Sequence, residues 1–69
     1  MAGGALHGVV AEFDEARGLG VIAAATGEPF PFHCVSIADG SRSIAVGAEV
    51  TFDVLLKLGR REAAAIRPT

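Results

Sequence analysis

The chain has 69 residues and a net charge of −2 at pH 7, with 51% hydrophobic residues but only 6% aromatic ones. At this length we expect a single domain spanning 1–69, because a second core needs a longer chain. The acidic balance excludes a protein that attracts polyanions through its net charge. Any contact with a polyanion should use the segment 57–67, which carries four of the six basic residues.

The cysteine content and the hydropathy of the chain indicate the cellular compartment to expect. Cys34 is the single cysteine, so no disulfide can form within the chain and an oxidising compartment is not implied. No apolar run approaches 18 residues, and no signal-peptide pattern opens the chain. We therefore expect a soluble, cytoplasmic protein without a membrane partner.

Glycines divide the first part of the chain into short apolar segments. The segments LHGVVAEF and LGVIAA are rich in strand-forming residues and flank DEARG, which has the turn chemistry of a hairpin. TGE marks the next turn, before PFPFHC, and IADGSRSIAVG is a long irregular connection. Turn signals spaced by roughly 8–12 residues are typical of a small barrel or sandwich.

The clearest strand signal is EVTFDVLL, in which Val50, Phe52 and Val54 alternate with polar residues. This period of two predicts one buried face and one solvated face. The last segment, REAAAIR, has strong helix propensity but is too short for a stable helix without packing, so a closing strand is favoured. The sequence predicts an all-β fold, a five-stranded antiparallel OB-fold barrel. The expected strands lie near 6–13, 18–24, 29–33, 48–56 and 61–67.

The sequence indicates no enzyme, metal site or cofactor. Ser36, His33 and Asp39 are the residue types of a hydrolytic triad, but closeness in sequence is no evidence for triad geometry, and nothing marks an oxyanion hole. His33 and Cys34 do not make a zinc site, because His7 is remote and no second cysteine exists. We expect no catalytic residues, no metal and no cofactor.

A family resemblance enters at the first hairpin. GVVAEFDEARGLGVI is similar to the opening of cold-shock proteins, G-x-V-x-W-F-N-x-x-K-G-F-G-F-I, and FPFHC lies where that family carries V-F-V-H-F. The resemblance covers 6–67 and implies a barrel that binds single-stranded RNA or DNA by stacking bases on aromatic side chains of the first three strands. The positions in register are Gly8, Phe13, Gly18, Gly20, Ile22, His33, Ile37, Gly47, Val50 and Phe52.

The resemblance also implies that most stacking positions have lost their aromatic side chains. Glu12 stands where the family has Trp. Four other residues stand where the family has aromatic ones: Leu19, Val21, Pro31 and Cys34. Phe30 and Phe32 alternate with Pro31 and should point into the core. Each base–aromatic stack contributes about 1–3 kcal/mol to binding. Because most of these stacks are lost, the resemblance implies a low affinity for nucleic acid.

Other contact residues keep the family's type. Phe13 and His33 are retained, and Arg17 replaces the family's Lys with another basic residue. Lys57 and Arg60 lie in the turn before the last strand, in a loop that flanks the binding face of OB barrels. The candidate nucleic-acid-binding residues are therefore Phe13, Arg17, Leu19, Val21, Pro31, His33, Cys34, Lys57 and Arg60.

Two functions remain open at this point. The first is a cold-shock-like protein that binds single-stranded nucleic acid weakly and with little sequence preference. The alternative is a protein-interaction or self-associating barrel, since an exposed patch of Leu19, Val21, Pro31 and Cys34 would mark an interaction site or a homodimer interface.

Overall fold

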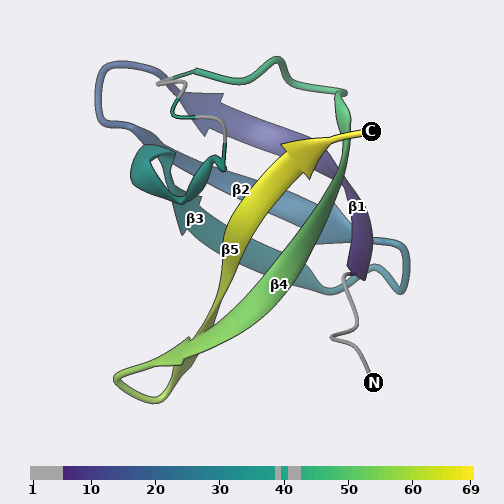
Figure 1. Cartoon of the computed structure of the whole chain (residues 1–69), viewed down its shortest axis with the longest axis vertical. Coiled ribbons are helices and arrows are strands. Elements are labelled where there is room, and N and C mark those ends of the chain that lie inside the picture. The colour runs from purple at the N-terminus through teal and green to yellow at the C-terminus, as the bar shows by residue number, and fades with distance from the viewer. Residues whose placement is uncertain (1–5, 39, 41–42) are drawn as a thin grey trace.

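The fold is an antiparallel sheet of five strands that curls around a single interior (Figure 1). The computed structural model describes residues 6–38, 40 and 43–69, with the side chain of Lys57 left out. The elements are β1 (Leu6–Asp14), β2 (Leu19–Ala24), β3 (Pro29–His33), the short 3-10 turn η1 (Cys34–Ser36), β4 (Glu49–Lys57) and β5 (Arg60–Pro68). The all-β, five-stranded prediction is confirmed, and each strand ends within one residue of its expected position.

Hydrogen bonding orders the strands β3-β2-β1-β4-β5. The two end strands of this order, β3 and β5, contact each other across the barrel, and Figure 1 shows β5 lying beside β3. The segment that follows β3 and η1 in the chain is joined to β5 by a parallel bridge between Ile37 and Ile66. There the Ala38 amide donates a hydrogen bond to the Ile66 carbonyl at 2.8 Å. Because β3 is an edge strand, it accommodates Pro31, which has no amide to donate.

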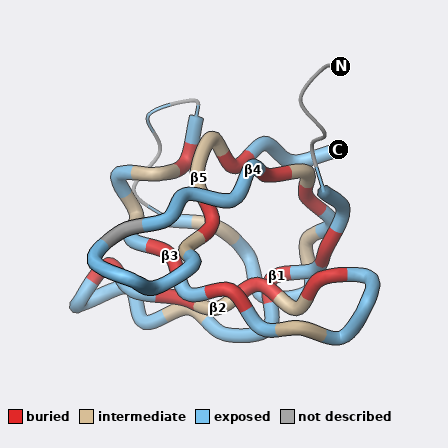
Figure 2. The backbone as a smooth tube through the Cα atoms, turned by 90° about the horizontal axis from the view of Figure 1, so that it is seen from below, coloured by how far each residue is buried: buried red, intermediate tan, exposed pale blue. Residues whose placement is uncertain are grey.

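The core is aliphatic with a few aromatic rings. Phe30, Phe32 and Phe52 are all at most 2% exposed, as their alternation predicts. The rings of Phe30, on β3, and Phe52, on β4, lie 5.3 Å apart and are tilted by 57°, so they pack against each other in the interior. Figure 2 shows buried positions alternating with exposed ones along the strands. The largest fully buried side chains are those of Phe52, Ile22, Ile66, Val10 and Val50.

A bulge in β1 decides which side chains face the interior near the end of this strand. Val10 pairs with Ile22, but Glu12 pairs with the preceding residue Val21, so Ala11 is an extra residue. The extra residue shifts the alternation by one position. Glu12 therefore faces outward, and the next side chain, Phe13, faces the interior.

The segment that could have been a helix is the strand β5. Its pairing with β4 begins at Lys57 and Arg60, and the turn between them consists of Leu58 and Gly59 with φ of 51° and 80°. Two central residues with positive φ make this a type I′ turn, the tight hairpin connection whose twist matches the strands. The ladder with β4 supplies packing and hydrogen bonds that stabilise the segment as a strand.

Among the described residues, no helix has the length and apolar character needed to cross a membrane.

Candidate functional site

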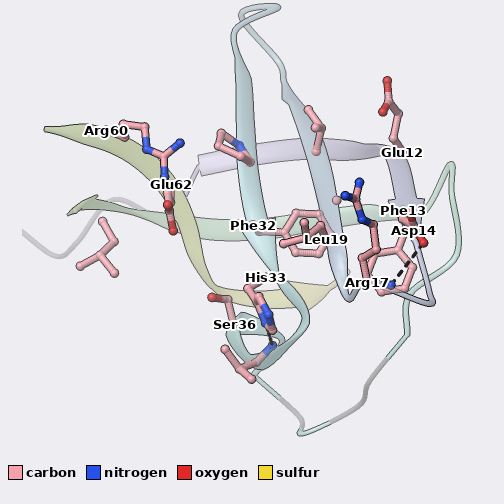
Figure 3. A pocket seen from close by; sticks show the side chains of 15 residues that line it. Glu12, Phe13, Asp14, Arg17, Leu19, Phe32, His33, Ser36, Arg60 and Glu62 are labelled. Atoms are coloured by element: carbon pink, nitrogen blue, oxygen red, sulfur yellow. Dashed lines mark hydrogen bonds between the residues drawn. The ribbon is translucent and has the colours of Figure 1, made fainter. Parts of the chain in front are cut away.

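The described surface contains a hollow of about 780 Å³. It lies over the outer side of β1, β2 and β3 and is bounded by the β4–β5 hairpin (Figure 3). The hollow is open on one side, and its lining mixes apolar side chains with charged ones. Most of the residues expected to contact nucleic acid line it.

Strand register explains why these side chains meet. Val21 of β2 pairs with Glu12 of β1 on one side and with Pro31 of β3 on the other. Leu19 and His33 form the neighbouring pair. Directly paired residues project on the same face of a sheet, so these five side chains form two adjacent rows along the hollow. The register brings together the four predicted residues among them, which are all but Glu12.

Cys34 is the predicted residue that the structure does not bring to the hollow. The chain leaves β3 after His33 and turns into η1, so the strand alternation ends there. The Cys34 amide donates to the Gly18 carbonyl at 2.7 Å, and its half-buried side chain packs against the core. A side chain on Gly18 would meet the Cys34 Sγ at 2.9 Å, which shows how closely the two segments approach. The apolar patch loses Cys34 and includes instead Val35, which is 80% exposed and lines the hollow.

Phe13 reaches the hollow from the interior side of β1. It is half-buried, and its ring stacks on that of Phe32, with centroids 5.9 Å apart and planes within 8° of parallel. Phe32 also lines the hollow, although its side chain is almost wholly covered. From its sequence pattern, Phe32 was expected only to be a core residue and not to line the hollow. The sequence signal for this additional role was Gly20 on the neighbouring strand, which has no side chain and so leaves room for the Phe32 ring.

The turn between β1 and β2 holds Arg17 at one end of the hollow. The Asp14 carboxylate accepts hydrogen bonds from the amides of Ala16 and Arg17, at 3.1 and 3.3 Å. This Asx-type arrangement stabilises the turn. The Arg17 side chain is exposed and lines the hollow beside Asp14 and Phe13 (Figure 3).

The opposite end of the hollow is formed by the β4–β5 hairpin. Arg60, one of the candidate binding residues, lies there together with Glu62 and its cross-strand partner Leu55. The last two residues were missed by sequence reasoning, because their position depends on how the hairpin folds over β3. The side chain of Lys57 lies outside the described part of the structure.

The neighbouring Arg61 is engaged elsewhere. It forms an ion pair with Glu28, and its guanidinium lies 5.8 Å from the centroid of the Phe30 ring. Arg60 and Arg61 project from opposite faces of β5 because they are adjacent in a strand. The hairpin therefore directs Arg60 to the hollow and leaves Arg61 outside it.

His33 is oriented by the backbone that follows it. Its Nδ1 accepts a hydrogen bond from the Val35 amide at 3.4 Å and lies 3.8 Å from the Cys34 Sγ. A neutral ring in this arrangement carries its proton on Nε2, which is then the nitrogen that can donate to a ligand. Asp39 lies outside the described residues. Within those ranges, no three His, Cys, Asp or Glu side chains are grouped to hold a metal ion.

Comparison with protein families identifies a match that covers most of the chain. The model of the family described as 'Cold-shock' DNA-binding domain matches residues 6–69, all but the first five residues of the chain. No curated protein matches the sequence significantly.

Proposed function

Because the chain belongs to the 'cold-shock' DNA-binding domain family, we propose that it binds single-stranded RNA or DNA in the hollow, weakly and with little sequence preference. Nucleic-acid binding is the property of the family. The observation that supports the proposed place is the register of β1, β2 and β3, which gathers Leu19, Val21, Pro31 and His33 on one outer face. The proposed role is binding without catalysis.

Weak binding follows from the side chains on this face. Leu19, Val21 and Pro31 offer small apolar surfaces where aromatic rings would each contribute about 1–3 kcal/mol of stacking per base. His33 supplies a flat ring, but Phe13 and Phe32 are mostly occupied in stacking on each other. A single strand would therefore rest on a largely aliphatic surface, which discriminates poorly between bases.

The charges of the hollow limit the contribution of the phosphates. Arg17 and Arg60 line it at its two ends, but Glu12, Asp14 and Glu62 line it as well. Few phosphates are neutralised in such a site. For single strands, the logarithm of the affinity falls with that of the salt concentration by about 0.7 per phosphate contact, so we expect a shallow slope.

The test is a titration with fluorescent oligothymidine and oligouridine at low and moderate salt. Arg17→Ala and Arg60→Ala should each weaken binding and reduce the salt slope. Arg67→Ala is the matched control, because Arg67 is an exposed arginine of β5 that does not line the hollow. An affinity that is unaffected by salt and by both substitutions would contradict phosphate contacts in this hollow. Absence of binding at any salt concentration would refute the proposed function itself.

A second candidate function is self-association or protein binding through apolar contacts. Leu19, Val35 and Leu55 all line the hollow and are 46%, 80% and 48% exposed. Exposed apolar groups gathered on one face tend to mark interaction sites. Light scattering over a range of concentrations tests the homodimer, and the double variant Val35→Ser, Leu55→Ser should return a dimer to the monomer.

A further inference from the structure

We infer that Glu12 makes the hollow prefer bases that present N–H donors on their pairing edge, guanine above all, over thymine and uracil. The inference rests on the proposed nucleic-acid binding in the same hollow and adds a preference at one base position. It concerns the residue of this face that differs most in chemistry from the aromatic side chain that the cold-shock pattern has at the same position.

The position of Glu12 follows from the strand pairs. Val21 and Pro31 are direct neighbours on β2 and β3, and Glu12 is the direct neighbour of Val21 on β1. Neighbouring strands lie about 4.8 Å apart, so a base that lies flat on Val21 and Pro31 spans the distance from β3 to β2. One edge of that base then points toward the next strand, β1, where the side chain in the same row is Glu12.

Within the described part of the chain, the oxygens of the Glu12 carboxylate are available to a ligand. Glu12 is exposed and lines the hollow, and no described side chain forms a hydrogen bond or ion pair with it. Two other acidic side chains near the hollow or the hairpin are engaged: the Asp14 carboxylate accepts hydrogen bonds from two backbone amides of its turn, and Glu28 is paired with Arg61. Figure 3 shows Glu12 at the opposite side of the hollow from Glu62 and Arg60.

An ionised carboxylate can only accept hydrogen bonds. Guanine presents its N1–H and N2–H groups side by side on the pairing edge, so both can donate to the two oxygens of one carboxylate. Cytosine and adenine each present one exocyclic amino group. Thymine and uracil present two carbonyl oxygens around a single N–H, and these oxygens repel a carboxylate. Charge-assisted, bidentate contacts are the strong class of hydrogen bond, so guanine should gain most.

The first test compares three fluorescent 12-mers: alternating guanine–thymine, alternating inosine–thymine, and oligothymidine. Inosine differs from guanosine only by lacking the N2 amino group, so it removes one of the two donors. We expect the guanine strand to bind at least about five-fold more tightly than oligothymidine, the minimum expected of a bidentate base contact, with the inosine strand between them. Equal affinities for the three strands would overturn the inference but leave the proposed function intact.

The second test assigns the preference to one residue. Glu12→Gln keeps the size of the side chain and removes its charge. If Glu12 acts only by repelling phosphates, the substitution should tighten binding of all three strands equally. If it reads the base edge, oligothymidine should gain affinity while the ratio of guanine strand to oligothymidine falls toward one. Glu15→Gln is the matched control, since Glu15 is an exposed carboxylate of the adjacent turn that does not line the hollow, and it should leave the ratio unchanged.

The outcomes separate the two proposals. A guanine preference that survives Glu12→Gln overturns the assignment to Glu12. A preference that disappears equally in Glu15→Gln overturns it as well, because the effect would then be one of general charge. Failure of every strand to bind would overturn the proposed function together with the inference.

Discussion

The rings of Phe13 and Phe32 stack in parallel, with centroids 5.9 Å apart, although they belong to strands that are not neighbours in the sheet. The strand between them, β2, presents Gly20, which pairs with Phe13 on one side and Phe32 on the other. A side chain at Gly20 would meet the Phe32 ring at 2.5 Å. The glycine thus permits a contact that fixes the end of β1, and with it the position of Glu12 beside the hollow.

The first prediction concerns this glycine. Gly20→Ala should destabilise the protein by about 1–3 kcal/mol, the usual cost of overpacking a core, because the new methyl group collides with the Phe32 ring and with the Glu12 carbonyl. Chemical denaturation followed by circular dichroism measures the loss.

A double-mutant cycle identifies the source of that loss. Phe32→Leu removes part of the ring that Gly20→Ala would strike, so the cost of Gly20→Ala should be smaller in the Phe32→Leu background. An identical cost in both backgrounds would show that the ring does not set the requirement for glycine.

The second prediction concerns the core. Phe52 is 1% exposed and packs against Phe30, so Phe52→Ala should cost about 3–5 kcal/mol. This loss is comparable to the whole free energy of unfolding expected of a small domain, about 5 kcal/mol. The variant should lose its cooperative thermal transition. Leu56→Ala, on the same strand but 71% exposed, is the control and should melt near the parent temperature.

The third prediction concerns the β4–β5 turn. Leu58 has φ of 51° and is followed by Gly59 in a type I′ turn, where Asn is preferred because it tolerates positive φ. Leu58→Asn should raise the free energy of unfolding by about 0.5–1 kcal/mol, since it relieves part of a left-handed strain of about 1–2 kcal/mol. Leu56→Asn removes a neighbouring exposed leucine without changing the turn and should leave stability almost unchanged. Equal effects of the two substitutions would mean that the loss of an exposed leucine, and not the turn, is responsible.

The fourth prediction concerns the missing aromatic side chains. The variant Glu12→Trp, Leu19→Phe, Val21→Phe, Pro31→Phe restores aromatic residues at positions that face the hollow. Two productive stacks would contribute about 2–6 kcal/mol, which is about 30-fold to 10⁴-fold in affinity. Oligothymidine binding measured by fluorescence, with circular dichroism to verify folding, checks this.

A folded variant that binds oligothymidine no better than the parent would show that these four positions do not act as one binding face. The same variant should also weaken any self-association that uses the native apolar side chains, which light scattering would detect.

Local patterns were sufficient for the strands and the main core. The alternation in EVTFDVLL placed Phe52 in the interior, and the alternation in PFPFHC did the same for Phe30 and Phe32. The turn residues between these segments set the strand boundaries. Such features are local, because a period of two and the chemistry of a turn depend only on residues adjacent in the chain.

The composition of the hollow was decided by tertiary structure. The bulge at Ala11 turned Phe13 inward, the chain direction after His33 removed Cys34 from the face, and the long hairpin brought Leu55 and Glu62 to the rim. Each of these depends on contacts between segments of the chain and cannot be read from one segment alone. In β1 and in the hairpin the strand register decides which side chains face the hollow, because a shift of one residue exchanges the two faces of a strand.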